Sequence, residues 1–257
     1  MTSMVYVHID TTSNAVLSRN ITSNDFSRGI IHQPKNLLLL DPSSEFGEFE
    51  THTGLKIIRG TEETSAFFNA QRRKSSNDEV KWIDFSDSAL IKGLTPLEIS
   101  ELLYFGHMKT HLHSPFFYKL QNNFVYFDLK DDLARVYYRY LDEFYRVLAD
   151  KISRIVLERI NDRKSFFRKA TPVEKLNIEL LVQLKSLFQE GVIFCFKQTE
   201  LVNKRYRIPI YLVEEAGLKT LDSQHHQESL AATLIFDAGT KRWTLDYVED
   251  DFARFIR

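Results

Sequence analysis

The spacing of apolar residues predicts a long helix in the middle of the chain. Between Asp131 and Asn161 apolar residues recur every three or four positions, and neither proline nor glycine interrupts them. This spacing places the apolar side chains on one stripe of an α-helix. At about 1.5 Å per residue, a helix of about thirty residues would be about 45 Å long, the width of a small domain. We therefore expect other elements to pack along this helix.

Two Thr-Pro pairs predict the starts of further helices. The sequences Thr95 to Glu98 and Thr171 to Glu174 each combine a threonine at the N-cap, a proline at the first helical position and a glutamate three residues after the cap. This combination is typical of a capping box. The second start opens an amphipathic run that ends near Gly191, where glycine favours a helix C-terminus. Shorter helices are expected over Thr61 to Lys74 and Glu249 to Arg257.

Short apolar or alternating runs predict strands towards both ends of the chain. In the N-terminal part these runs are separated by clusters of Ser, Thr, Asn, Asp and Pro, which are typical of turns. After Gly191 the apolar period changes from that of a helix to that of a strand, and Asp237 to Thr240 is expected to close a hairpin. The predicted strands are Val5 to Ile9, Ala15 to Asn20, Asn36 to Asp41, Leu55 to Arg59, Val80 to Phe85, Val192 to Thr199, Tyr206 to Glu214, Ala231 to Asp237 and Lys241 to Tyr247.

These elements together predict an α+β fold, in which an antiparallel sheet packs against long amphipathic helices. A strand-rich N-terminal part is expected over residues 1–78, and a core domain of helices and antiparallel sheet over residues 79–257. The polar segment from Gln71 to Glu79 is the expected linker. A chain of 257 residues is long enough for one large domain or two modest ones.

Composition and charge fit a globular protein of the cell interior. The chain is 43% hydrophobic and 27% charged, with a net charge of -1, so any attraction to nucleic acid must come from a local surface. Its one cysteine, Cys195, lies in an apolar run; it cannot form an intramolecular disulfide and is expected to be buried. We find no secretory signal and no run of eighteen apolar residues, and expect a cytoplasmic protein without membrane insertion.

Glycine is scarce, and its positions argue against the common nucleotide-binding loops. None of the nine glycines lies in a Gly-x-Gly pair or before a Lys-Ser or Lys-Thr pair. P-loop, Rossmann and kinase sites use such glycines to bring the backbone close to phosphates. Because a complete catalytic triad is also not recognisable, we expect a binding protein rather than an enzyme.

Three histidines lie on the helix expected to begin at Thr95, or just after it. In helical geometry His107 and His111 share a stripe about 60° wide with Ser100 and Tyr104. Two imidazoles four residues apart can chelate zinc or another divalent metal, which would activate water in a metal-dependent hydrolase. The candidate ligands are His107, His111 and His113, with a carboxylate such as Asp84, Asp87 or Asp128.

The residues around these histidines also favour a simpler alternative. Met108 to Thr110 contains no glutamate, although a metalloprotease helix carries one between its histidines. Pro115 disfavours the helical conformation of the residue before it, so His113 can point elsewhere. The alternative to a metal site is a hydrogen-bonded histidine cluster.

A basic loop after the long helix is a candidate nucleic-acid site. Its cations would neutralise phosphates while its two phenylalanines stack on bases, as in proteins that bind single strands. The candidate residues are Arg163, Lys164, Phe166, Phe167, Arg168 and Lys169, with Arg159 just before them. Basic residues elsewhere that would extend the patch are Arg72, Arg73, Lys74, Lys204, Arg205 and Arg207. The alternative is an exposed connector anchored to the core by its phenylalanines.

The leading hypothesis is a regulatory or adaptor protein that binds a protein or a small ligand. Aromatic residues dominate protein interfaces, and they are dense between the expected histidine helix and the strand that follows. A groove beside Tyr104 and His107 is a plausible recognition surface. The expected surface comprises Tyr104, His107, His111, His113, Phe116, Phe117 and Tyr118.

Overall fold

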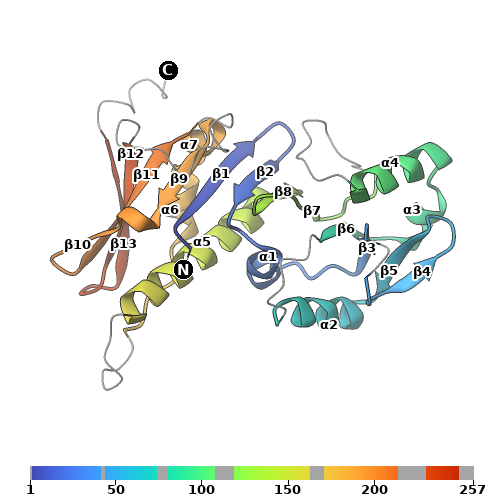
Figure 1. The fold of residues 1–257 in the computed structure, drawn as a ribbon, viewed down its shortest axis with the longest axis horizontal. Coiled ribbons are helices and arrows are strands. Elements are labelled where there is room, and N and C mark those ends of the chain that lie inside the picture. The colour runs from blue at the N-terminus through green and yellow to red at the C-terminus, as the bar shows by residue number, and fades with distance from the viewer. Residues whose placement is uncertain are drawn as a thin grey trace. The chain divides into compact units, whose positions relative to one another are not determined.

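The computed structural model describes residues 2–41, 44–73, 80–107, 119–162, 171–213 and 230–248 (Figure 1). It confirms the α+β class, with antiparallel strands and packed helices. The chain divides into two compact units. Unit 1 comprises Met1–Asp10, Ser18–Asn20 and Tyr145–Arg257, and unit 2 comprises Thr11–Leu17 and Ile21–Phe144. The domain boundary expected near residue 78 falls at residues outside the described ranges and stays a prediction.

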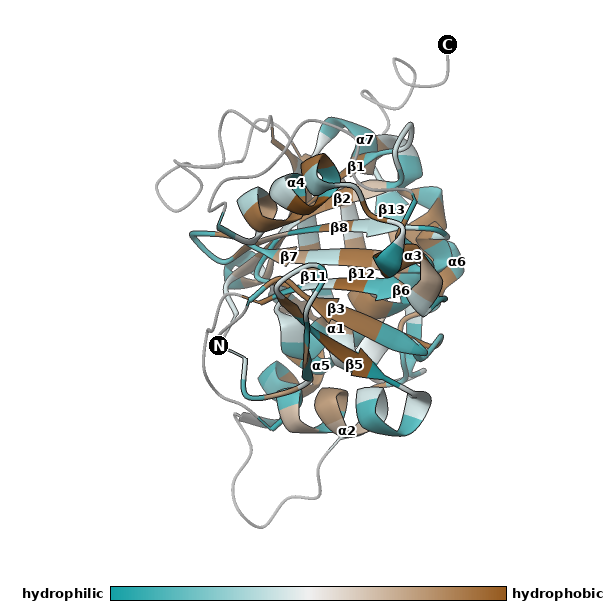
Figure 2. Cartoon of the chain, turned by 90° about the vertical axis from the view of Figure 1, so that its right-hand side faces the viewer, coloured by the Kyte–Doolittle hydropathy of each residue, from teal (hydrophilic) through white to brown (hydrophobic). Residues whose placement is uncertain are grey.

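Unit 2 is built on an antiparallel sheet with the strand order β8-β7-β6-β3-β5-β4. The register places Leu38 opposite Ile83 on one side and Ile57 on the other, so the apolar centres of β3, β6 and β5 are aligned. Figure 2 shows β3 and β5 largely in the brown of apolar residues. The strands are β3 (Asn36–Leu39), β4 (Glu48–Glu50), β5 (Leu55–Arg59), β6 (Lys81–Phe85), β7 (Phe124–Asp128) and β8 (Leu133–Tyr138).

Helices cover both faces of the unit 2 sheet. On one face α1 (Ser23–Gly29) and α2 (Thr61–Gln71) pack against Trp82, whose ring lies 5.3 Å from that of Phe67 and 6.3 Å from that of Phe26. On the other face α4 (Pro96–His107) packs through Phe105, whose ring lies 6.5 Å from that of Phe127. A short helix, α3 (Ser88–Lys92), follows β6. Successive residues of β6 therefore face different helices.

Unit 1 contains a second set of antiparallel strands, in the order β13-β12-β11-β9-β1, with β10 paired to β11. The expected hairpin between the last two strands is confirmed, because Phe236 pairs with Trp243. Cys195 is buried, as expected. The strands are β1 (Met4–Asp10), β9 (Val192–Cys195), β10 (Glu200–Val202), β11 (Arg205–Leu212), β12 (Leu230–Asp237) and β13 (Arg242–Tyr247); β2 (Ala15–Arg19) is divided between the units.

The long central helix begins later than its apolar spacing predicts. Residues Leu133–Tyr138 form strand β8, and α5 spans Leu141–Asp162. Asp131 and Asp132 have φ angles of 62° and 57°, a left-handed conformation that turns the chain from β7 back into β8. The expectation of one helix from residue 131 was therefore wrong, because the aromatic and β-branched residues of β8 also fit a strand paired with β7.

The second Thr-Pro pair does not start a helix. Instead the backbone N–H of Thr171 donates to Asn161 Oδ1 at 2.8 Å, and that of Leu176 donates to Ser153 Oγ at 2.9 Å. In a helix starting at Thr171 the Leu176 N–H would instead donate to the Pro172 carbonyl, so its bond to Ser153 competes with that helix. The structure has no helix from Thr171 to Asn177. The expected single helix is then split into α6 (Ile178–Gln183) and α7 (Lys185–Glu190).

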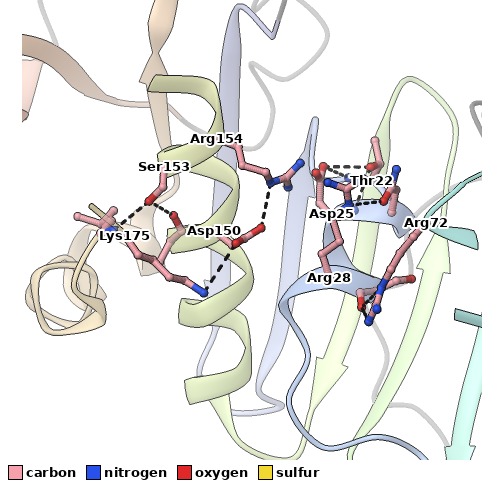
Figure 3. A network of polar contacts seen from close by, with 12 residues as sticks. Thr22, Asp25, Arg28, Arg72, Asp150, Ser153, Arg154 and Lys175 are labelled. Carbon is pink, nitrogen blue, oxygen red and sulfur yellow. Dashed lines mark hydrogen bonds and ion pairs between the residues drawn. The ribbon is translucent and has the colours of Figure 1, made fainter. Parts of the chain in front are cut away.

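Ionic contacts reinforce this side of α5. Asp150 accepts from Arg154 Nε at 2.9 Å and lies 3.7 Å from Lys175 Nζ. Figure 3 shows the Asp150 carboxylate between these two cations, with Ser153 one turn along the helix. Asp150 and Arg154 of α5 thus make ionic contacts within unit 1. The closing helix expected over Glu249 to Arg257 lies outside the described residues.

Helix α1 starts at a complete capping box that the sequence analysis missed. The Thr22 hydroxyl accepts from the Asp25 N–H at 3.3 Å, and the Asp25 carboxylate accepts from the Thr22 N–H at 2.9 Å (Figure 3). Arg72 of the α2 C-terminus donates to the Ser27 carbonyl, which ties the two helices together. The short length of α1 left no periodic pattern that would predict it.

We expect Thr22→Ala to lower the free energy of unfolding of unit 2 by about 1 kcal/mol, because it removes the hydroxyl that accepts at the helix start. Urea denaturation followed by circular dichroism measures this loss. Thr22→Ser is the matched control, since it keeps the hydroxyl and should lose much less. Equal losses in the two variants would contradict the capping role.

Candidate functional site

The first turn of α4 is held by the capping box that the sequence predicts. The Thr95 N–H donates to Glu98 Oε2 at 2.7 Å, and the Glu98 N–H donates to Thr95 Oγ1 at 3.3 Å. Lys119 Nζ adds an ion pair to Glu98 Oε1 at 3.0 Å. The Thr95 N–H and the Lys119 ammonium lower the pKa of Glu98 to about 2. The glutamate is therefore ionised at any physiological pH, and the helix start is fixed in position.

The inward face and C-terminal end of α4 are also tightly held. Leu102 is fully buried, and Lys81, itself only 5% exposed, donates from Nζ to the Gly106 carbonyl at 2.8 Å. A Cβ added at Gly106 would lie 2.7 Å from the Leu40 carbonyl oxygen, so only glycine allows this approach of helix to strand. The helix is thus anchored along its length.

The outward face of α4 carries large apolar side chains in solvent. Leu97 is 70% exposed, Tyr104 64% and Leu103 39%. Ser100 and His107 are exposed on the same side. At 100° per residue these five positions cover about 120° of the helix, opposite buried Leu102. We call Leu97, Ser100, Leu103, Tyr104 and His107 the α4 surface.

The structure describes only part of the recognition surface expected from sequence. Tyr104 and His107 lie on the α4 surface, as members of the predicted polar stripe. The other members, His111, His113, Phe116, Phe117 and Tyr118, lie outside the described residues. The complete expected surface therefore stays a prediction.

The metal hypothesis stays a prediction for the same reason. Within the described ranges no group of three His, Cys, Asp or Glu side chains is close enough to hold a metal ion. Two of the carboxylates suggested as ligands have structural partners: Asp87 Oδ1 caps α3 through the Ala89 N–H at 2.8 Å, and Asp128 accepts from the Tyr126 hydroxyl. The third, Asp84, has a less usual environment, described below.

The candidate nucleic-acid loop, Arg163 to Lys169, also lies outside the described residues. Three of the six basic residues expected to extend it are engaged elsewhere. Arg205 Nε lies 3.1 Å from Asp237 and Arg207 Nη2 lies 3.8 Å from Asp246, both within the unit 1 strands. Arg72 belongs to unit 2, where it binds the Ser27 carbonyl. Nucleic-acid binding stays a prediction that rests on the loop itself.

The third suggested carboxylate, Asp84 of β6, is buried. Asp84 is 0% exposed and faces the same side of the sheet as Trp82. Its Oδ2 accepts from the Asn123 N–H at 2.9 Å and from Asn122 Nδ2 at 3.3 Å. Its Oδ1 is buried with no hydrogen-bond partner among the described residues. Burial raises the pKa of Asp84 to about 6, against the effect of these hydrogen bonds, and the charge of Glu143 adds to the rise.

Glu143, in the first turn of α5, binds His32 at the surface of unit 2. Glu143 Oε1 accepts from the His32 N–H at 3.1 Å and also contacts His32 Nδ1. The Glu143 side chain is 7% exposed and that of His32 is 61% exposed. Burial and the charge of Glu143 hold the pKa of Tyr138 well above its usual value. Asp84 and Glu143 are thus buried, whereas His32 is exposed to solvent.

No family model, curated protein or solved structure matches the chain. Among the described residues no helix combines the length and apolar character needed to cross a bilayer.

Proposed function

We propose that the protein acts as a regulatory or adaptor component, and that it binds a protein partner through the α4 surface. The observation that carries this proposal is the exposure of two leucines and a tyrosine on a helix whose other face is fixed by Leu102, Lys81 and the capping box. Clustered exposed apolar residues of this kind are typical of interaction sites. Catalysis is not part of the proposal.

Rigidity of α4 favours binding. Because both ends of the helix are held, Leu97 and Tyr104 are presented without a further cost in backbone order. Tyrosine is enriched among the residues that contribute most to protein interfaces, and leucines around it exclude water. Tyr104 is therefore the expected centre of the contact, with Leu97 and Leu103 beside it.

The chemistry of the surface favours a protein over a small ligand. Small ligands are bound in concave pockets, whereas these side chains project outward from an exposed helix. The expected partner offers an apolar groove or an amphipathic helix, which pairs with anchors spaced like Leu97 and Tyr104. Exposed Glu101 borders the surface and would favour a basic group at the rim of the partner. The buried, unpaired thiol of Cys195 is compatible with the cytoplasm as the site of action.

Site-specific photo-crosslinking tests the proposal. A benzophenone amino acid in place of Tyr104, in the full chain and in its own cells, is expected to give one discrete adduct with a protein. The same probe in place of Tyr140, which is 55% exposed in unit 2, should not give that adduct. Adding Leu97→Asp to the Tyr104 probe protein should reduce the adduct at least tenfold.

Circular dichroism shows whether the Leu97→Asp protein is folded, as expected for a residue 70% exposed. The proposal would be overturned by an absent adduct at Tyr104. It would equally fail if the adduct were the same at Tyr140, or if it persisted in folded Leu97→Asp protein.

A further inference from the structure

Two turns of unit 1 lie side by side at one end of its strands (Figure 1). The first joins β10 to β11, and the second joins β12 to β13. The Ala238 N–H of the second turn donates to the Lys204 carbonyl of the first at 3.0 Å, and Arg205 Nε lies 3.1 Å from Asp237 Oδ2. The two turns therefore form one surface. We call residues 201–205 and 237–242 the hairpin tip.

Hydrogen bonds and turn geometry fix the backbone of the hairpin tip. Asn203 and Lys204 have φ angles of 51° and 66°, the left-handed conformation of a two-residue hairpin turn. In the second turn Asp237 Oδ1 accepts from the N–H groups of Gly239 and Thr240 at 2.8 and 3.0 Å. The side chains of the tip are therefore presented in a defined arrangement.

The hairpin tip is basic, although the net charge of the whole chain is -1. Its only acid, Asp237, is paired with Arg205. Just outside the tip, Glu200 lies opposite Arg207, which also lies 3.8 Å from Asp246. Three cations of the tip are exposed and form no ion pair within the part of the chain that the structure describes: Lys204, Lys241 and Arg242. Charge complementarity therefore favours an anionic partner.

Two exposed aliphatic side chains lie beside these cations. Leu201 is 54% exposed and Val202 is 49% exposed. Leu201 pairs with Tyr206 and Val202 with Arg205, and successive residues of a strand point to opposite faces. A protein that covered one face of the hairpin would leave the other aliphatic group in water. The interface of a lipid bilayer is fluid, so it can surround both groups.

Nucleic acid would match the charge of the hairpin tip, but it fits the apolar groups less well. Proteins that bind single strands stack the bases on aromatic rings. The Trp243 ring lies 4.9 Å from that of Phe236, and its Nε1 donates to the Glu174 carbonyl at 2.8 Å, so this ring is held by contacts within unit 1. Tyr206 is half-buried. The exposed apolar groups of the tip are aliphatic, which favours lipid.

We propose that the hairpin tip binds the surface of a bilayer that contains anionic lipids. Leu201 and Val202 enter the interface, and the three unpaired cations lie at the headgroups. Each cation close to such a surface strengthens binding about fivefold. Binding is peripheral, because only side chains of two turns enter the lipid. This surface belongs to unit 1, whereas the α4 surface belongs to unit 2.

Co-sedimentation of the full chain with phosphatidylcholine vesicles tests the proposal. Wild-type protein is expected to bind when the vesicles contain phosphatidylserine, and the binding should weaken as salt screens the charges. A variant with Lys204→Asn, Lys241→Asn and Arg242→Gln should bind about 100-fold more weakly. Asparagine suits the first two positions, whose φ angles of 66° and 58° are left-handed. Leu201→Ser with Val202→Thr should weaken binding about tenfold and preserve its salt dependence.

The matched control replaces three exposed lysines of unit 2, by Lys35→Gln, Lys92→Gln and Lys130→Gln. It changes the net charge by the same amount and should bind as the wild type does. Circular dichroism shows whether each variant is folded. Absence of wild-type binding overturns the proposal, as does wild-type affinity in either folded tip variant or equal weakening in the control. A single-stranded oligonucleotide that binds through the three cations, without vesicle binding, would assign the tip to nucleic acid instead.

Discussion

Replacing Trp82 by alanine is expected to lower the free energy of unfolding of unit 2 by about 3–5 kcal/mol, the range for removing a large buried aromatic side chain. Trp82 is 2% exposed at the centre of the unit 2 core. Its ring lies 5.5 Å from Phe68 of α2 and 5.0 Å from Tyr126 of β7, with the latter stacked at 27°. Both helices on this face of the sheet lose a ring contact when Trp82 is removed.

Urea denaturation followed by circular dichroism measures this effect. Phe49→Ala, at a residue of β4 that is 66% exposed, removes another aromatic ring from the same unit and should change the free energy by less than about 0.5 kcal/mol. Trp82→Phe should lie between the two, since it keeps a ring in the cluster. A loss below about 1 kcal/mol for Trp82→Ala would show that this residue is not central to the core.

In unit 1 the largest expected effect of a single added methyl group is at Gly191. The residue ends α7 with φ 92° and ψ 126°, a conformation that side chains with a Cβ rarely adopt. A Cβ at this position would lie 2.6 Å from the Val213 carbonyl oxygen, which belongs to backbone and cannot rotate away. We expect Gly191→Ala to cost about 2–4 kcal/mol, from backbone strain and from the displacement of Val213.

Gly54→Ala separates these two causes. Gly54 also has a positive φ, 71°, but an added Cβ would meet nothing within 4 Å. Its substitution should therefore cost only the conformational term, about 1–2 kcal/mol. Fluorescence of Trp243 reports on unit 1 for the Gly191 variant, and that of Trp82 reports on unit 2 for the Gly54 variant. Equal losses would contradict the steric argument at Gly191.

The α4 surface leaves apolar side chains in water. Leu97 is 70% exposed and Tyr104 64%, although burial of such side chains is favourable. Stability alone does not explain this exposure, which is why the surface carries a functional proposal.

The positions of the side chains on the α4 surface were predicted only in part from the sequence. Tyr104 and His107 were predicted to share a stripe because helical periodicity alone determines which residues share a face. Their exposure, and that of Leu97, was not predictable, because an apolar residue on a helix is equally consistent with a face that packs on a sheet. Asp84 was named from the sequence as a possible metal ligand, but its burial was not predictable, because Asn122 and Asn123, which donate to it, are distant in sequence.

The two Thr-Pro pairs show what a local signal can determine. Thr95 to Glu98 starts α4 because the bonds of its capping box lie within four residues and need no distant partner. Thr171 to Glu174 carries the same pattern, yet Asn161 binds the Thr171 N–H and Ser153 binds the Leu176 N–H, and no helix forms there. The same capping-box pattern therefore reaches different conformations when distant side chains compete for the backbone groups.

The sequence by itself determined the α+β class, the helix start at Thr95, the turn at Gly191 and most strand positions, because periodicity and turn chemistry act over a few residues. Only the tertiary structure decided that Leu133 to Tyr138 is a strand, since its apolar residues fit either conformation until β7 pairs with them. Likewise, only the tertiary structure brings His32 to Glu143. Contacts between residues far apart in sequence depend on how the elements pack, and no local pattern records that packing.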